Sequence, residues 1–228
     1  LPRACMRGSG LRSSTLILTM VIGLTYDLRS EYLASGYSAE DVAEFDSEAT
    51  LEALERTIQS LGHTTERIGH ARSLCRRLAE GGRWDLVFNI AEGLHGRSRE
   101  AQVPCILEAH DIPYSFSDPL VCAMTLDKAV AKHLVKSAGL ATAPFAVLRS
   151  PVDRISPELS YPLFVKPIAE GTGKGITPDS RADSPEAVTS VCRRLLEEYR
   201  QAVLVEEFLP GREFTVGILG TGNSARVL

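Results

Sequence analysis

The sequence has no long apolar run, no paired cysteine motif and few lysines. The longest apolar stretch near the start, residues 16–24, contains Thr19 and is too short to cross a bilayer. The chain has five cysteines, an odd number, and no two of them are spaced as Cys-x-x-Cys. This pattern argues against a zinc site and against a disulfide framework. It favours reduced, mostly buried thiols. With a formal net charge of -4 over 228 residues, the composition gives no reason to expect nucleic acid or an anionic membrane as partner.

Lysine is confined to one stretch of the chain. Lysine and arginine together number 25, yet every basic residue outside this stretch is arginine. The lysines are Lys128, Lys132, Lys136, Lys166 and Lys174. Lysine is a compact charge on a flexible stem, which some phosphate sites use in place of the planar fork of arginine. For Lys132 and Lys136, chance clustering on an exposed helix is the favoured interpretation.

Up to about residue 124 the sequence alternates between apolar strand patterns and amphipathic helix patterns. Strands are expected at 16–24, 64–68, 84–90 and 112–116, and helices at 47–61, 71–79 and 100–110. Such alternation predicts a parallel sheet with helices on both faces. The first 15 residues hold three arginines and no acid, so residues 1–19 are interpreted as a leader or an extension without a fold.

After Pro119 the composition shifts, and hairpin patterns replace the alternation. Thr125 is expected to cap a helix that ends near Ser137, and Ser184 with Pro185 to start another that ends near Tyr199. Strands are expected at 144–148, 162–168, 202–208, 213–219 and 225–228. These patterns predict domains at 20–124, 125–205 and 206–228, the last of them incomplete.

Two blocks of residues carry the chemistry. In the first, residues 166–175, a buried strand delivers Lys166 to a loop with three glycines in five residues. Such a loop lets backbone N–H groups approach an anion closely, although a flexible hairpin is an equal alternative for the loop alone. In the second, residues 203–216, an apolar strand ends in Glu206 and Glu207 and restarts with Glu213 after a turn. Strand-end solvation is the alternative for these acids.

In this order and spacing, the two blocks resemble the ATP-grasp family, and most closely the D-alanine–D-alanine ligases. Asp127-Lys128, the turn 139–144 and the run 100–115 add to the likeness, which covers residues 21–228. The resemblance implies an α/β protein. A parallel-sheet pre-ATP-grasp substrate domain would precede an α+β ATP-grasp lid and the first strands of the large ATP-grasp subdomain.

The resemblance also implies an ATP site. Lys128 and Lys166 would contact the phosphates, and the loop residues Glu170, Gly171, Thr172, Gly173 and Gly175 would close over them. The adenine would lie against Glu206, Glu207 and Leu209, and the ribose against Glu213. The implied cofactors are ATP and Mg²⁺. The implied reaction joins two amino acids, D-alanine to D-alanine, through an acyl phosphate, for peptidoglycan precursors in the cytoplasm. A homodimer is possible.

The sequence departs from the family at the amino-acid site. Thr172 and Gly173 stand where the family commonly has two adjacent serines, and the first-strand loop offers Asp27, Arg29 and Glu31 rather than a serine and a glutamate. His95-Gly96 resembles a family pair, but its spacing to the next helix differs. Glu31, His95 and Thr172 are therefore the candidate substrate residues, and the amino acids joined are the least determined part of the prediction.

The family holds its magnesium ions, and an arginine that stabilises the transition state, in the second half of the large subdomain. That half lies beyond Leu228, so no metal ligand and no catalytic residue is assigned, and the chain by itself is expected to be inactive. The first alternative is a degenerate or regulatory nucleotide-binding protein without ligase activity. The second is an unrelated α/β protein that binds another small ligand.

Overall fold

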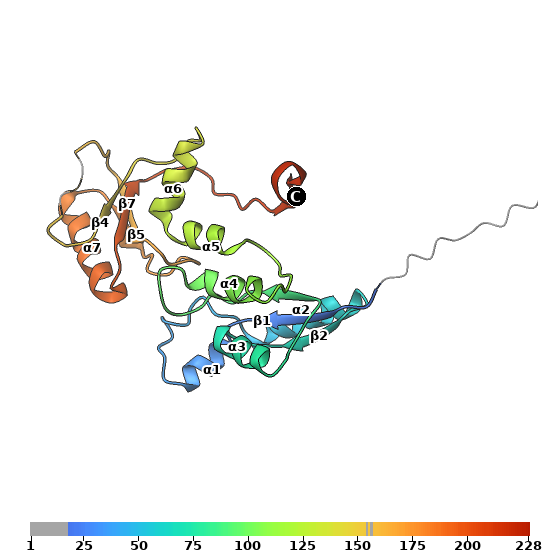
Figure 1. Ribbon diagram of the computed structural model, residues 1–228. Coiled ribbons are helices and arrows are strands. Elements are labelled where there is room, and N and C mark those ends of the chain that lie inside the picture. Colours follow the sequence, from blue (N-terminus) through green and yellow to red (C-terminus); the bar gives the residue numbers. More distant parts are fainter. Residues whose placement is uncertain (1–17, 154, 156) are drawn as a thin grey trace, which may run out of the picture. The chain divides into compact units, whose positions relative to one another are not determined.

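The computed structural model describes residues 18–153, 155 and 157–228, so nearly all of the expected leader at 1–19 lies outside the described residues. The chain divides between Ala123 and Met124 into two compact units, each described here by itself (Figure 1). In the described part of the chain, no helix is both long and apolar enough to cross a membrane.

The first unit is built on a parallel sheet, as the sequence predicts. Its strands are β1 (Val21–Thr25), β2 (Thr64–Arg67) and β3 (Leu86–Asn89), in the order β2-β1-β3. Its helices are α1 (Arg29–Ala34), α2 (Glu48–Ser60), α3 (Ala71–Ala79), the 3-10 turn η1 (Arg99–Ala101) and α4 (Gln102–Glu108). Because side chains alternate along a strand, Leu86 and Phe88 join the core beneath α2, whereas Val87 joins the core beneath α3 and α4.

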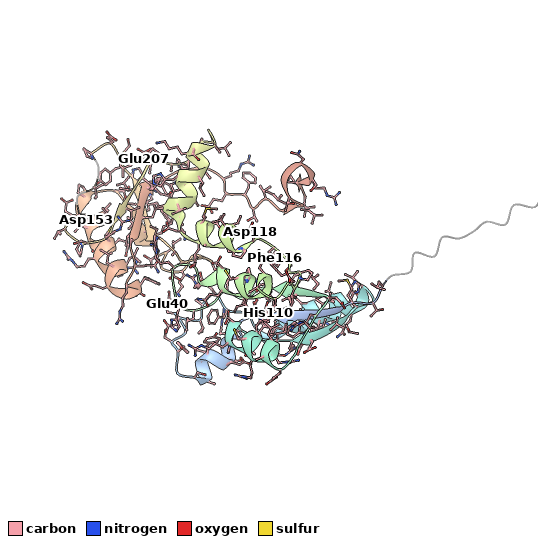
Figure 2. All side chains as sticks on the ribbon, viewed as in Figure 1. Glu40, His110, Phe116, Asp118, Asp153 and Glu207 are labelled. Carbon is pink, nitrogen blue, oxygen red and sulfur yellow. The ribbon has the colours of Figure 1, made fainter. Side chains whose placement is uncertain are left out.

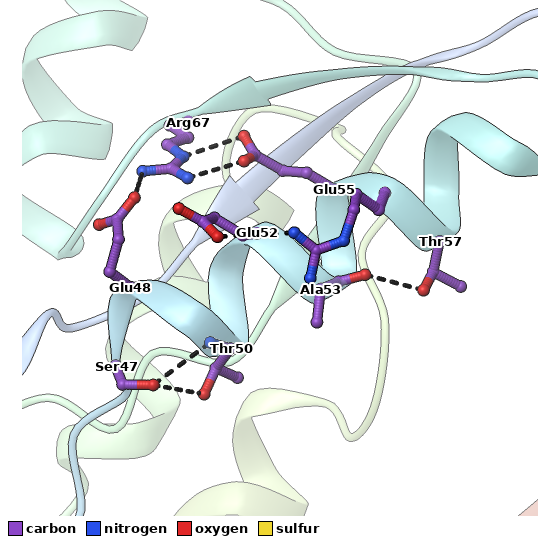
Figure 3. Close-up of polar contacts among 9 residues, drawn as sticks. Ser47, Glu48, Thr50, Glu52, Ala53, Glu55, Thr57 and Arg67 are labelled. Carbon is purple, nitrogen blue, oxygen red and sulfur yellow. Dashed lines mark hydrogen bonds and ion pairs between the residues drawn. The ribbon is translucent and has the colours of Figure 1, made fainter.

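An ion-pair network holds α2 against β2 (Figure 3). Arg67 donates from Nε and Nη2 to the two carboxylate oxygens of Glu55, at 2.9 and 2.7 Å, and from Nη1 to Glu48. The hydrogen bonds from Arg67 hold the pKa of Glu55 below its ordinary value. This two-pronged contact fixes the helix more firmly than a single charge pair does.

Two expected strands of the first unit differ from the structure. The first strand begins at Val21, and residues 18–20 before it are not in a strand. Residues 16 and 17 of the expected strand lie outside the described residues. The strand expected at 112–116 is reduced to an isolated bridge between Val87 and Tyr114. Pro113 has no N–H to donate to a ladder, and Phe116 has a φ of 71°, which turns the chain away from the sheet. The helices α1 and α5 (Pro119–Leu126) were not expected.

The second unit is built on an antiparallel sheet in the order β4-β7-β5-β6. Its strands are β4 (Phe145–Leu148), β5 (Leu163–Pro167), β6 (Arg181–Ala182) and β7 (Val203–Glu207). Its helices are α6 (Lys128–Ser137), the 3-10 turn η2 (Pro178–Ser180) and α7 (Pro185–Tyr199), and α5 (Pro119–Leu126) contains the division between the units. Core residues of α7 pack on one face of the sheet, and Ala129 of α6 belongs to the core on the other.

The residue that caps α6 is Asp127, not Thr125. Thr125 lies inside α5, and the Asp127 carboxylate accepts hydrogen bonds from the backbone N–H groups of Ala129 and Val130 at 3.0 and 3.2 Å. Both residue types cap helices well. Thr125 and Asp127 lie two positions apart in the sequence. The sequence did not indicate that another helix, α5, ends at Leu126, directly before Asp127.

The end of the chain holds less strand than expected. Only β8 (Ile218–Leu219) and β9 (Arg226–Val227) pair, around the 3-10 turn η3 (Gly222–Ser224). Residues 213–217, expected in a strand, have no ladder partner among the described residues. The strand β7 continues through Glu206 and Glu207, so the sheet of the second unit extends beyond residue 205. A separate subdomain from residue 206 stays a prediction.

Candidate functional site

Strand alternation places Lys166 and Glu206 on the same face of the second unit's sheet. Phe164 of β5 pairs with Glu206 of β7, and Lys166 pairs with Leu204. Lys166 and Glu206 are therefore diagonal neighbours, a separation that a long side chain can span. Leu204 of this face packs in the core with Ala129 of α6, so both charged side chains point to the side that α6 covers.

Lys132, Lys166 and Glu206 form a charged cluster, called here the lysine–glutamate cluster. Lys166 Nζ lies 2.5 Å from Glu206 Oε1, and Lys132 Nζ lies 2.6 Å from Glu206 Oε2. Each ammonium also lies over an aromatic ring, Lys132 over Phe145 at 5.2 Å and Lys166 over Phe164 at 5.7 Å. The two lysines thus take one carboxylate oxygen each.

The Glu206 carboxylate is ionised in this cluster. Burial favours its neutral form and raises its pKa, but the hydrogen bonds and charges of Lys132 and Lys166 outweigh burial and hold the pKa below its ordinary value. The side chains of Glu206 and Lys132 are each 13% exposed. A partly buried site with two cations and one anion is suited to an anionic ligand.

The glycine-rich loop is anchored beside this cluster at Glu170. Lys128 Nζ donates to the Glu170 carbonyl oxygen, and Lys128 N donates to the carbonyl oxygen of Ile168 at 3.0 Å. The Glu170 carboxylate accepts from Gln201 Nε2 at 2.6 Å and lies 3.1 Å from Lys174 Nζ. These contacts bring Lys128 to the loop and hold Lys174 within it.

Beyond Glu170 the loop turns through left-handed backbone. Thr172, Gly173 and Gly175 have φ values of 50°, 78° and 77°. The N–H of Lys174 donates to Gly171 O at 2.9 Å, which closes a tight turn. Residues 171–173 are exposed.

The other expected ATP-site residues extend from the same sheet. Glu207, labelled in Figure 2, ends β7 and accepts from Ser160 N at 2.8 Å. Leu209 is 67% exposed, and Glu213 is exposed on irregular backbone. The structure brings Lys128, Lys166, Glu170 and Glu206 into one sheet-and-loop region, and Leu209 and Glu213 follow it without regular pairing.

The first unit contains a cavity of about 560 Å³ that both Glu31 and His95 line. At its wall, Asp27 is only 2% exposed and accepts from Tyr32 Oη at 2.5 Å and from Gly93 N at 2.8 Å. Two of the candidate substrate residues therefore share one cavity. The third, Thr172, belongs to the second unit.

Sequence reasoning missed Lys132, which it assigned to an exposed helix face. The one available signal was its spacing of four residues from Lys128, which places both on the same side of a helix. It also missed Glu92, whose pKa is raised to about 7 by burial and by the nearby charges of Glu100 and Glu44. Nothing in the sequence around Glu92 distinguishes it from a surface acid.

A metal ion held by the described residues would need a group of suitable side chains around it. No group of three or more histidine, cysteine, aspartate or glutamate side chains in this part of the chain has a geometry that fits a metal ion. Magnesium therefore has no ligand assigned among these residues.

Comparison with known proteins identifies the relatives of this chain. Residues 134–228 match the family model described as the D-ala D-ala ligase C-terminus. The chain is 39% identical over 129 residues to a D-alanine–D-alanine ligase of Geobacter sulfurreducens, covering 55% of this chain and 40% of the relative. It is 35% identical over 164 residues to one of Janthinobacterium sp., covering 69% and 48%. Over these segments the chain is similar in sequence to D-alanine–D-alanine ligases.

Solved structures agree with the fold of this ligase-like chain. A D-alanine–D-alanine ligase from Bacillus anthracis complexed with ATP matches with a TM-score of 0.58 and 19% identity, covering 92% of this chain and 70% of that one. The VanG D-Ala:D-Ser ligase from Enterococcus faecalis matches with a TM-score of 0.61 and 21% identity, covering 92% and 68%. The α/β fold with a parallel and then an antiparallel sheet is confirmed. The matched segment spans less than half the length of the curated relatives.

Proposed function

We propose that the second unit binds ATP for an ATP-dependent ligase that joins two amino acids, D-alanine to D-alanine, in peptidoglycan precursor synthesis. The observation that carries the proposal is the convergence of Lys128, Lys166 and the glycine-rich loop at the end of β5. Lysine charges beside exposed loop amides suit a phosphate chain. The similarity to D-alanine–D-alanine ligases supports the reaction class.

Each side chain has a proposed role. Lys128 and Lys166 stabilise the charge that moves between phosphate oxygens, while the loop 170–175 closes over the triphosphate and excludes water. Glu206, Glu207 and Leu209 line the adenine, and Glu213 accepts from the ribose. Glu31 and His95, in the cavity of the first unit, contact an amino-acid substrate, and Thr172 contributes from the loop.

The proposed reaction proceeds in two steps. The carboxylate of the first amino acid takes the γ-phosphoryl group of ATP, which gives an acyl phosphate and ADP. The amine of the second amino acid attacks the acyl carbon, and phosphate leaves with the bonding electrons. Mg²⁺ would neutralise phosphate charge in such a transfer. The cytoplasmic location and a homodimer stay predictions.

A regulatory nucleotide-binding protein without ligase activity is the second candidate. It is favoured by Gly173, which lacks a hydroxyl where the family has a serine. It is also favoured by Asp27, whose carboxylate already accepts from Tyr32 and Gly93. Both features bear on the amino-acid site, and neither removes the lysines proposed to contact the phosphates, so they leave nucleotide binding in place.

The assignment of Lys166 is tested by ATP titration of the purified chain and its Lys166→Ala variant. We expect the variant to bind ATP at least about tenfold more weakly, because one phosphate-facing charge is lost. In an active enzyme the same change would cost on the order of 2 to 4 kcal/mol of transition-state stabilisation. Lys166→Arg would not restore this transition-state stabilisation, because the planar guanidinium of arginine does not replace the compact charge of lysine.

Lys136→Ala is the matched control, since Lys136 is an exposed lysine on α6 and should leave ATP affinity unchanged. Because the 228-residue chain is expected to be inactive by itself, phosphate release from ATP with magnesium is measured on a chain extended to the length of its relatives, where it separates the two candidates. Release that depends on D-alanine supports the ligase, whereas ATP binding without it supports the regulatory protein. Equal ATP affinity of the unchanged chain and Lys166→Ala would refute the role of Lys166.

A further inference from the structure

Lys132 has the surroundings of a functional residue rather than of a surface lysine. Its ammonium is held from three elements of the second unit. It donates to Thr142 Oγ1 at 2.9 Å in the turn after α6, lies 2.6 Å from Glu206 Oε2 of β7, and lies over the Phe145 ring of β4. One helical turn later, Lys136 is exposed. The fold thus orders one of these two lysines and leaves the other in solvent.

We propose that Lys132 is a positioning residue for nucleotide binding, because it shares Glu206 with Lys166 and so leaves Lys166 with positive charge for the ATP phosphates. The inference rests on the proposed ATP site and deepens it. Lys132 itself touches no phosphate in this account. It acts through the carboxylate that lies between the two ammonium groups.

A count of charges gives the physical reason. Two ammonium groups and one carboxylate leave the lysine–glutamate cluster with one surplus positive charge. Without Lys132 the remaining pair of Lys166 and Glu206 has no net charge. The pair then attracts a triphosphate only as a dipole does, which is weaker than the attraction of a net positive charge. At a partly buried site, where water screens less than in bulk, this difference is amplified.

Stability alone does not account for the arrangement. Burying a cation costs desolvation energy that an ion pair must offset. One lysine neutralises Glu206, so a second lysine at 13% exposure adds a desolvation cost without a second anion to offset it. An anionic ligand at the neighbouring loop supplies that anion. The cluster therefore has the charge of a site that is completed by a phosphate ligand.

The experiment is a double-mutant cycle in nucleotide affinity. ATP and adenosine are titrated into the unchanged 228-residue chain and into Lys132→Met, Glu206→Gln, the double variant and the control Lys136→Met. We expect Lys132→Met to weaken ATP binding about tenfold and to leave adenosine affinity within about twofold, since only the phosphates sense the lost charge. Lys136→Met should bind both ligands like the unchanged chain. Cooperative thermal unfolding of each variant confirms that it is folded.

The double variant tests whether Lys132 acts through its charge on Glu206 or only through packing. Glu206→Gln removes the carboxylate, so the double variant regains the surplus charge. Since Glu206 is also proposed to line the adenine, the ratio of ATP affinity to adenosine affinity is compared, and in the double variant it should return to within about threefold of its value in the unchanged chain. A ratio in the double variant as low as that of Lys132→Met, or a loss of adenosine affinity in Lys132→Met equal to its loss of ATP affinity, overturns the inference. So does a Lys132→Met variant with unchanged ATP affinity. If the unchanged chain does not bind ATP, the proposed function itself fails, and this role fails with it.

Discussion

Gly175 is the residue of the glycine-rich loop at which backbone and packing both require glycine. Its φ is +77°, and a Cβ there would lie 2.6 Å from Pro167 Cγ and 3.0 Å from Tyr199 Cε2. Gly175→Ala should lower the free energy of unfolding by about 2 to 4 kcal/mol, since left-handed strain adds to overpacking. Urea denaturation measures the change.

Gly139 provides the matched control for that substitution. It has a similar φ of +75°, but nothing lies within 4 Å of the Cβ that alanine would add. Gly139→Ala should therefore lower the free energy of unfolding only by the strain of left-handed backbone, about 1 kcal/mol. Equal losses in the two variants would show that the contact with Pro167 does not constrain the loop.

At the scale of elements, the helix α6 should link the stability of the second unit to the proposed ATP site. Its N-cap, Asp127, accepts two backbone hydrogen bonds, and the helix carries both Lys128 and Lys132. Asp127→Ala should cost about 1 to 2 kcal/mol of unfolding free energy and should also weaken ATP binding, because the lysines lose their rigid support. Asp127→Asn, which keeps a capping oxygen, should restore most of both. Urea denaturation and ATP titration measure the two effects.

A cap in the other unit separates these effects. Ser47 caps α2 in the first unit and accepts from Thr50 N. Ser47→Ala should lower stability by a similar amount, about 1 kcal/mol, without weakening ATP binding. If both cap variants weakened ATP binding alike, the loss in Asp127→Ala would reflect general destabilisation.

At the scale of the whole molecule, the last residues expose apolar side chains. Phe214 is 72% exposed, Ile218 is 66% exposed and Leu228 is 80% exposed. Contiguous exposed apolar surface and short, unprotected strands favour association with other chains. The double substitution Phe214→Ser with Ile218→Ser should raise the solubility limit of the chain and reduce light scattering. Leu61→Ser, at a 60% exposed leucine that follows α2, should have little effect. No gain in the double variant relative to this control would contradict the prediction.

The sequence by itself determined where most elements lie, and it indicated which residues of the second unit could bind phosphate. Helix 71–79 matches its predicted bounds, the observed helix is one residue shorter than 47–61 at each end, and the observed strand is one residue shorter than 64–68 at its last position. The spacing of apolar residues, and the glycines and prolines that end helices and strands, are local properties that act over a few residues. The lysine and glycine block at 166–175 is equally local, so it was visible before any contact was known.

Tertiary structure decided what depends on residues far apart in the chain. Lys132 and Glu206 are separated by 74 positions, and only the pairing of β4, β7 and β5 beneath α6 brings them within hydrogen-bonding distance. The same holds for the strand expected at 112–116, which needs a ladder partner along its whole length and finds one only at Tyr114. A side chain's spacing along the chain fixes its face on an element. Its partner, and hence its charge state and role, follows from what the fold places opposite that face.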